Sequence, residues 1–257
     1  MGDDPLDLDE LPYVYEGQRQ LAVPSMCVTL GWPSLWIAEP QTGIAWKQVL
    51  HGEQRFELHR PLLPNGAIRA EYKVSAVADK GVGCGALVYF DTDLSDALTG
   101  AKVASMRATI FLRGDGGCGS FGTPPAGLPP LSDGASCVAS VDYRTTRQAA
   151  LLYRLVSRDY MPIHADPAIA RQAGFEQPIS HGLNTMGLAC RAILKHFAPA
   201  QPERLRMMAV RFVAPAYPGD TIRIEMFEDD GQIRFWAQAV ERRQLVLDRG
   251  ECRLAAR

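Results

Sequence analysis

Two segments of this chain share one twelve-residue pattern, and this repeat constrains the fold more than any other feature. Residues 60–71 read RPLLPNGAIRAE and residues 214–225 read APAYPGDTIRIE, without a gap. The matching pairs are Pro61 and Pro215, Pro64 and Pro218, Ile68 and Ile222, Arg69 and Arg223, and Glu71 and Glu225. Prolines before an alternating run are typical of a chain that leaves one strand, turns and enters the next, and chance convergence of such turns is the alternative. Taken as a duplication, the repeat predicts two equivalent lobes.

Alternating and β-branched runs, separated by Gly, Pro or Asp, surround both copies of the repeat. They predict strands over residues 55–60, 67–78, 85–94 and 102–112, and again over 206–213, 221–227, 233–240 and 245–254. Residues 143–156 are interpreted as one more strand and its approach. Residues 120–136 hold four prolines and several glycines, which is typical of an extended linker. The predicted lobes are therefore residues 1–119 and 137–257.

Two helices are predicted in the second half of the chain. A long helix covers residues 182–197, where apolar side chains recur near helical spacing along one face. A short helix covers residues 167–173, because Asp166 suits the N-cap, Pro167 the first helical position and Gly174 the end. A helix wrapped by a curved antiparallel sheet, repeated once, is the α+β architecture called a double hot-dog. The first lobe is expected to be incomplete, with two interpretations open: its first strand is absent, or the true start of the chain lies upstream.

Charge and composition exclude several classes of function. The 27 basic and 29 acidic side chains are well mixed and give a net charge of −2, so no surface for nucleic acid is expected. No apolar run approaches the roughly 18 residues that a membrane-spanning helix needs, and the acidic start of the chain is unlike a signal peptide. The six cysteines form no C-x-x-C pair, and no histidine stands at zinc spacing. We therefore expect a reduced, cytoplasmic protein without a metal site.

The segment from Gly114 to Gly119, GDGGCG, formally matches the dinucleotide fingerprint G-x-G-x-x-G and follows a predicted strand. In a true fingerprint a helix begins next and offers its N-terminus to a pyrophosphate. Here the proline-rich linker follows instead. The glycines are therefore expected to allow tight backbone turns rather than to bind a nucleotide.

A loop with two titratable side chains is the best candidate for chemistry. Asp159 and His164 lie five positions apart, and Pro162 between them prevents a continuous helix. A carboxylate and an imidazole that share a water can deprotonate it and pass a proton to a neighbouring carbon. Gly182 begins the predicted long helix, where free N–H groups and the helix dipole favour a developing negative charge. Together these groups suit the addition of water to an α,β-unsaturated thioester, whose oxygen rests on the Gly182 N–H as it becomes an enolate.

Residues 153–167 read YRLVSRDYMPIHADP, and AGF and PISHGL follow by residue 183. This stretch resembles the hydratase 2 motif of the MaoC-like family, roughly Y-R-L-S-G-D-x-N-P-L-H-x-D-P followed by A-G-F and P-I-x-H-G-L. Segments similar to the family's long, two-lobe members are residues 4–16 (DPLDLDELPYVYE), 50–54 (LHGEQ), 79–87, 111–119 and 211–220 (RFVAPAYPGD). The resemblance implies a double hot-dog protein that adds water reversibly to trans-2-enoyl-CoA to form (R)-3-hydroxyacyl-CoA, with no metal or redox cofactor.

By position in the motif, Asp159 and His164 correspond to the water-activating and proton-delivering pair, and Gly182 corresponds to the oxyanion donor. The resemblance also implies that the first lobe covers the acyl chain, in a pocket with room for long or branched chains. Two positions depart from the motif. Arg158 replaces a glycine, and Met161 replaces an asparagine that in the family helps to hold the catalytic water. Methionine cannot donate a hydrogen bond and accepts only weakly.

The remaining polar candidates carry weaker signals. His181 is expected to set the geometry of the loop before Gly182, next to the substrate. The basic residues considered first for the CoA phosphates are Lys80, Arg113 and Arg211, although solvated surface charge is the usual fate of such residues. The histidines interpreted as structural are His51, His59 and His196.

Three functions stay open at this point. The first is a hydratase or dehydratase of enoyl-CoA. The second is a protein of the same fold that binds acyl thioesters without turnover, for which Arg158 and Met161 are the best support. The third is a hydratase retuned to another acyl group, for example a steroid side chain or an aromatic acid. In each case the expected partner is an acyl-CoA, with no nucleic acid and no membrane, and a homodimer is one of the assemblies considered.

Overall fold

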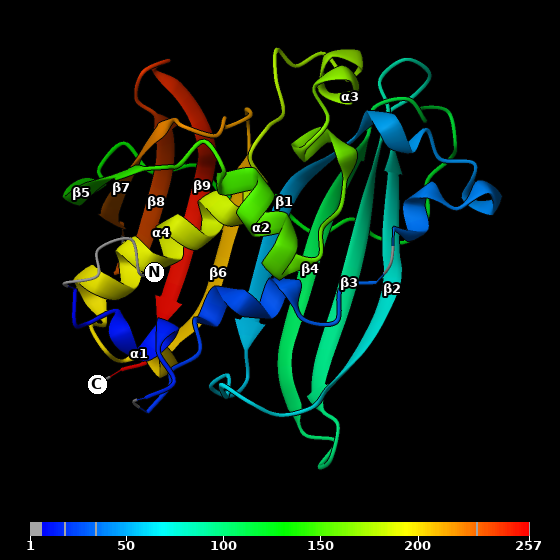
Figure 1. Cartoon of the computed structure of the whole chain (residues 1–257). Helices are drawn as coiled ribbons and strands as arrows, with labels where there is room; N and C mark the ends of the chain where they lie inside the picture. Colours follow the sequence, from blue (N-terminus) through cyan, green and yellow to red (C-terminus); the bar gives the residue numbers. More distant parts are fainter. Residues whose placement is uncertain (1–6, 18, 34, 230, 257) are drawn as a thin grey trace.

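The computed structural model describes residues 7–17, 19–33, 35–229 and 231–256. In these residues nine strands form one antiparallel sheet in the order β2-β3-β4-β1-β6-β9-β8-β7-β5. The strands are β1 (Val49–Leu58), β2 (Ile68–Asp79), β3 (Ala86–Asp96), β4 (Lys102–Leu112), β5 (Ser136–Arg144), β6 (Leu205–Phe212), β7 (Thr221–Asp229), β8 (Gln232–Ala239) and β9 (Gln244–Leu254). The helices gather on one face of this sheet (Figure 1).

The strand order confirms the double hot-dog. Strands β2-β3-β4-β1 form the first lobe, and β6-β9-β8-β7 repeat the same order in mirror image from the central pair β1–β6. The two repeated sequence segments lead into β2 and β7, which are equivalent strands. Strand β5 adds a further edge to the second lobe, and in the described residues the first lobe has no strand equivalent to β5.

The long helix α4 (Gly182–Phe197) has the predicted bounds and lies against the second half of the sheet (Figure 1). Its buried side chains include Met186, Ile193 and Leu194, which join one core cluster with residues of β6 to β9. The short helix α3 (Pro167–Gln172) also forms as predicted. The Asp166 carboxylate accepts hydrogen bonds from the first free N–H groups of α3.

Residues 143–156 do not form the predicted strand. Strand β5 ends at Arg144, and helix α2 (Ala149–Ser157) follows it. The sequence of α2, AALLYRLVS, is a nearly continuous apolar run with two Ala, three Leu and one Arg. Such a run lacks the alternation of a half-buried strand and is composed of good helix formers. A short apolar run is compatible with both a strand and a helix. Here the intrinsic helix propensity of the residues favours the helix that forms.

The first lobe differs from the prediction that each sheet wraps a helix. In the described residues before β1, the chain forms the short helix α1 (Leu11–Val14) and four 3-10 turns. These turns are η1 (Pro24–Thr29), η2 (Trp36–Ala38), η3 (Pro40–Thr42) and η4 (Trp46–Gln48). Prolines and positive-φ glycines, among them Gly31 and Gly43, interrupt any longer helix. The first lobe is therefore lined by short turns where the second lobe has α4.

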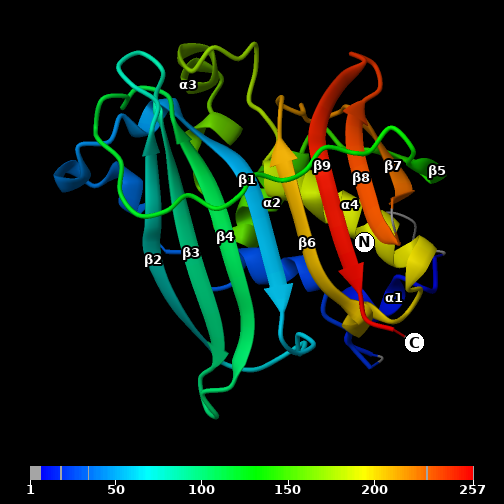
Figure 2. The same ribbon diagram turned by 180° about the vertical axis from the view of Figure 1, so that it is seen from behind.

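The predicted linker crosses the outer face of the sheet, behind the helices (Figure 2). It is held there by arginines of the second lobe. Arg249 donates to the Leu128 carbonyl at 2.8 Å, and Arg234 donates to the Pro129 carbonyl at 2.7 Å. Leu128 also packs against Met207 and Ala209 on β6. This segment is extended, as predicted, and it seals the outer surface near the junction of the lobes.

A buried ion pair joins the start of the described chain to α4. The Arg191 guanidinium binds the Glu10 carboxylate, and the two side chains are only 6% and 2% exposed. The Arg191 guanidinium also lies 4.6 Å from the ring centre of Tyr143 on β5. The first-lobe sequence therefore crosses over and is anchored on the central helix of the second lobe.

Replacing Glu10 with Gln is expected to destabilise the fold strongly, because it leaves the Arg191 charge buried without its carboxylate. Breaking a buried pair on one side typically costs about 3–5 kcal/mol. The matched control is Asp142→Asn, which removes the exposed partner of Arg223 and is expected to cost less than about 1 kcal/mol. Urea denaturation of the three proteins measures both values. Equal midpoints for Glu10→Gln and Asp142→Asn would refute the expectation.

Candidate active site

The candidate site is built on the segment that runs from the end of α2 to the start of α4. Arg158 ends α2 with φ of 59°, a left-handed conformation. This conformation favours glycine, which explains why the motif carries glycine at this position. The Arg158 side chain points into solvent and does not line the main cavity. Arg158 thus terminates the helix, and its predicted contact with the substrate stays a prediction.

Asp159 and His164 line one cavity: Asp159 precedes the 3-10 turn η5 (Pro162–His164), and His164 is the last residue of this turn. The Asp159 carboxylate accepts a hydrogen bond from the Met161 N–H at 3.1 Å, which leaves its other oxygen available. The Nδ1 atom of His164 lies 2.8 Å from the Ile179 carbonyl. A carbonyl only accepts, so Nδ1 carries the proton and Nε2 keeps a free lone pair. The pair therefore offers a carboxylate and a basic nitrogen to one ligand.

His181 packs behind this pair, with 2% of its residue surface exposed. Its ring stacks on His164 with centroids 3.7 Å apart, and the Tyr153 ring lies tilted against it with centroids 4.8 Å apart. Its Nε2 donates to the Asp159 carbonyl at 3.3 Å. His181 thus holds both the backbone of Asp159 and the ring plane of His164, which agrees with the predicted role in loop geometry.

Burial keeps these imidazoles neutral at pH 7. Desolvation lowers the pKa of His164 below its usual value, although the nearby Asp159 charge opposes this shift. Desolvation, together with the neighbouring His164, lowers the pKa of His181 to about 4. A neutral His164 can accept a proton from water, as a general base must.

Gly182 is the first residue of α4 and lines the cavity next to the pair. A Cβ atom at this position would lie 2.8 Å from the Phe212 ring, so a larger residue requires that ring to shift. The N–H groups of a first helical turn lack partners within the helix and carry the positive end of its dipole. The site therefore combines a base, a carboxylate and a helix N-terminus.

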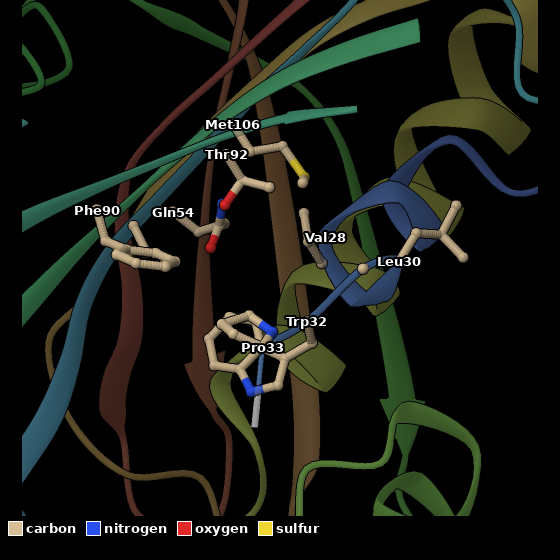
Figure 3. Close-up of a pocket in the computed structure, with 10 residues that line it drawn as sticks. Val28, Leu30, Trp32, Pro33, Gln54, Phe90, Thr92 and Met106 are labelled. Carbon is tan, nitrogen blue, oxygen red and sulfur yellow. The ribbon is translucent and has the colours of Figure 1, made fainter. Parts of the chain in front are cut away.

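The cavity has a volume of about 440 Å³ and is lined by both lobes. Most of its polar groups come from the second lobe. The apolar side chains that the first lobe contributes include Trp32, Leu35, Ile37, Val49, Ile110 and Phe111. A smaller cavity of about 10 Å³ lies beside it in the first lobe, where Gln54 and Thr92 lie near the rings of Trp32 and Phe90 (Figure 3). It has room for about one water, so the larger cavity is the candidate substrate site.

The other predicted residues fall in different places. Met161 lines the cavity, as predicted. Arg113 donates to the carbonyls of Gln48 and Ala173 at 3.0 and 3.3 Å, and Arg211 pairs with Glu53 at 2.6 Å. Lys80 lies 5.9 Å from the ring centre of Phe111, a residue of the cavity wall. A contact of any of the three basic residues with CoA phosphates stays a prediction. His59 and His196 are exposed, away from the cavity.

The glycine-rich segment folds around a carboxylate of the protein itself. Asp79 accepts hydrogen bonds from the N–H groups of Gly81, Gly117 and Gly119, at 2.9, 2.8 and 2.8 Å. These bonds lower the pKa of Asp79. The backbone donors that could bind a phosphate are thus occupied, which supports the interpretation as a tight turn.

Asp159, His164 and His181 are also the described residues that come nearest to a metal-binding cluster. Their ligand atoms lie within 4.8 Å of one another. The two imidazoles, however, are stacked face to face and do not converge on one point. Zinc ligands typically surround the ion at about 2.0–2.1 Å, so this arrangement fits a shared water better than a metal. The predicted absence of a metal stays a prediction.

The strand order makes this a double hot-dog protein. Its site is of the hydratase type, because a carboxylate, a neutral imidazole and a helix N-terminus lie at one end of an apolar cavity. Comparison with known proteins gives the family. A MaoC-like domain matches residues 132–249, and the MFE-2 hydratase 2 N-terminal domain matches residues 4–114. The chain belongs to the MaoC-like hydratase 2 family, in its two-lobe form.

Individual relatives agree with this assignment. The peroxisomal enoyl-CoA hydratase 2 of Arabidopsis thaliana is 32% identical over 96% of this chain and 83% of its own length. The crystal structure of a MaoC-like dehydratase from Phytophthora capsici superposes with a TM-score of 0.84 at 31% identity, covering 96% of this chain and 88% of that one. The peroxisomal multifunctional enzyme type 2 of Drosophila melanogaster is 36% identical over 79% of this chain, which spans 34% of that enzyme's length.

The neutral state of the buried histidines has a consequence for stability. The pKa values of His51 and His181 are lowered by burial to about 4, and that of His164 is also lowered. The unfolded chain, with histidine pKa values near 6.5, then binds more protons than the folded chain between these limits. Stability must decrease as the pH falls from 6.5 toward 4. Melting followed by circular dichroism should show Tm falling across this window, and a constant Tm would contradict the burial of these rings.

Proposed function

We propose that this protein is an enoyl-CoA hydratase, which adds water reversibly to a trans-2-enoyl-CoA to give the (R)-3-hydroxyacyl-CoA. The observation that supports it most directly is the free His164 Nε2 beside the Asp159 carboxylate, at one end of an apolar cavity of about 440 Å³. Relatives that carry the name enoyl-CoA hydratase 2 lend independent support. The reaction needs no metal or redox cofactor, because the water supplies both groups that are added.

The chemistry follows from the positions of the three groups. A water bound between Asp159 and His164 loses a proton to the base as its oxygen bonds to C3 of the substrate. The C2–C3 π electrons move to the thioester oxygen, which rests on the Gly182 N–H as an enolate. The acid form of the pair then delivers a proton to C2, which restores the thioester and the neutral site. Dehydration is the same sequence in reverse.

The size of the cavity bears on the choice of acyl group. Short 3-10 turns replace a central helix in the first lobe, and the apolar side chains of this lobe line much of the cavity. Long, branched or ring-bearing acyl chains therefore suit the site. A hydratase that acts on a steroid or aromatic acyl group would use the same mechanism on a different acyl group. A panel of trans-2-enoyl-CoAs of increasing bulk, followed by loss of enoyl-thioester absorbance, selects among them.

Location is part of the proposal. The described residues contain no helix long and apolar enough to cross a membrane. The predicted cytoplasmic location gains no support from the relatives, several of which have peroxisomal names. Whether the protein forms a homodimer stays a prediction.

Asp159→Asn and His164→Ala should each reduce kcat on the best enoyl-CoA to less than about a tenth of the wild-type value, since a positioned general acid or base contributes about 100- to 10,000-fold. The control is His196→Ala, an exposed histidine of α4, which should retain full activity. Circular dichroism confirms that each variant is folded. A folded Asp159→Asn or His164→Ala protein with near wild-type kcat would remove that residue from the mechanism.

The two departures from the motif are expected to have separate effects. Met161→Asn places donors and an acceptor beside Asp159, and one added hydrogen bond of about 1–1.5 kcal/mol corresponds to roughly five- to tenfold in kcat. Arg158→Gly should instead raise stability by about 1 kcal/mol, since it relieves a left-handed residue, and leave kcat unchanged. Kinetics and urea melts of the single and double variants measure both.

The same variants test the rival function, an acyl-CoA-binding protein without turnover. Met161 in the cavity wall is the observation in its favour. If acyl-CoA binds in calorimetry but neither the wild-type protein nor any of the three variants hydrates a substrate, binding without catalysis is the function.

A further inference from the structure

His51 connects the first lobe to the catalytic end of the cavity. It lies at a β-bulge in β1, where the register with β4 shifts between His51 and Glu53. The ring lines the cavity, and its Nε2 donates to the Glu53 carbonyl at 3.1 Å, within the bulge. Burial keeps the imidazole neutral, with its pKa lowered to about 4. A neutral ring does not compete with water for the Asp159 carboxylate.

The His51 ring packs on Phe212 at the end of β6, with ring centroids 4.9 Å apart and planes tilted by 59°. The last pair of the β1–β6 ladder is Glu53 and Arg211, so both rings lie just beyond the point where the two lobes stop pairing. Aromatic contact replaces the backbone hydrogen bonds there.

Phe212 in turn supports the start of α4. Its Cδ1 and Cε1 atoms occupy the space where a Cβ of residue 182 would be, at 2.8 Å. Three residues therefore touch in series across the lobe boundary, from His51 through Phe212 to Gly182. Because the Phe212 ring packs directly against Gly182, a shift of this ring changes the position of the Gly182 N–H.

We propose that His51 is a positioning residue, which holds Phe212 against Gly182 and so sets where the oxyanion donor meets the thioester oxygen. This inference rests on the proposed hydratase function. The first lobe then contributes to the chemical step as well as to the acyl pocket. Losing an oxyanion donor outright typically costs about 100- to 1,000-fold in rate, so a displaced donor should cost about tenfold or more.

Four variants distinguish the effect of the His51 ring contact from the effect of its nitrogen atoms. His51→Ala removes the contact, and His51→Phe keeps a ring on Phe212 without nitrogen atoms. Phe212→Leu removes the same contact from the other side and serves where His51→Ala folds poorly. His59→Ala is the matched control, because this histidine follows β1 and pairs with Ser105 at 2.9 Å on the surface.

The expected result is a fall in kcat of about tenfold or more for His51→Ala and Phe212→Leu, since the donor is displaced. KM and the Kd for a saturated acyl-CoA should change less than about threefold, since the acyl pocket is intact. His51→Phe and His59→Ala should stay near the wild type. If His51→Phe loses as much as His51→Ala, the nitrogens act directly and the positioning role is wrong. Unchanged kcat in His51→Ala also overturns it.

A second measurement does not depend on turnover. The carbonyl stretch of enoyl-CoA bound to Asp159→Asn protein, recorded by difference infrared spectroscopy, reports the oxyanion contact. It should shift to lower frequency on binding, and the shift should be largely lost when His51→Ala or Phe212→Leu is added. If the wild-type protein hydrates nothing, the hydratase proposal fails. The infrared shift then still decides on His51: loss of the shift supports the positioning role, and an unchanged shift refutes it.

Discussion

The site depends on the antiparallel ladder between β1 and β6, where the two half-sheets become one. On the inner face of this ladder Phe56 lies opposite Met208, and both are fully buried. On the outer face the Glu53 and Arg211 side chains bind each other across the lobe boundary. The ladder ends at this pair, and the cavity opens directly beyond it. The distance between the first-lobe wall and the catalytic loop is therefore set by strand pairing, the stiffest element available to the fold.

Three histidines line that opening, His181 buried and His51 and His164 half-buried, and the hydrogen bonds of each differ. His164 donates from Nδ1 to a carbonyl and presents a free Nε2 to the cavity. His181 donates a hydrogen bond from Nε2 to the Asp159 carbonyl, and its ring stacks on the His164 ring. His51 bonds within its own bulge. Because burial lowers the pKa of all three, positive charges do not accumulate beside Asp159, and its carboxylate stays available to water.

The sequence predicted those features that local pattern or motif spacing determines. Helix α4 has an apolar stripe between a motif glycine and a cluster of basic residues, and its bounds were predicted to the residue. Asp159, His164 and Gly182 stand on one continuous motif. Helix α2 was missed because its short apolar run has no clear period. The contact of His51 with Phe212 was missed because a pairing between distant strands leaves no local signal, and His51 was interpreted as a structural histidine outside the predicted strand.

The difference between the two lobes explains why a duplicated fold has one candidate site. In the second lobe α4 fills the concave face with Met186, Ile193 and Leu194. In the first lobe prolines and glycines prevent an equivalent helix, and the pairing of Glu10 with Arg191 draws the start of the described chain onto the second lobe. The concave face of the first lobe is therefore covered only by short turns. Space that a helix would otherwise fill becomes the apolar wall of the cavity, directly opposite the one loop that carries a base.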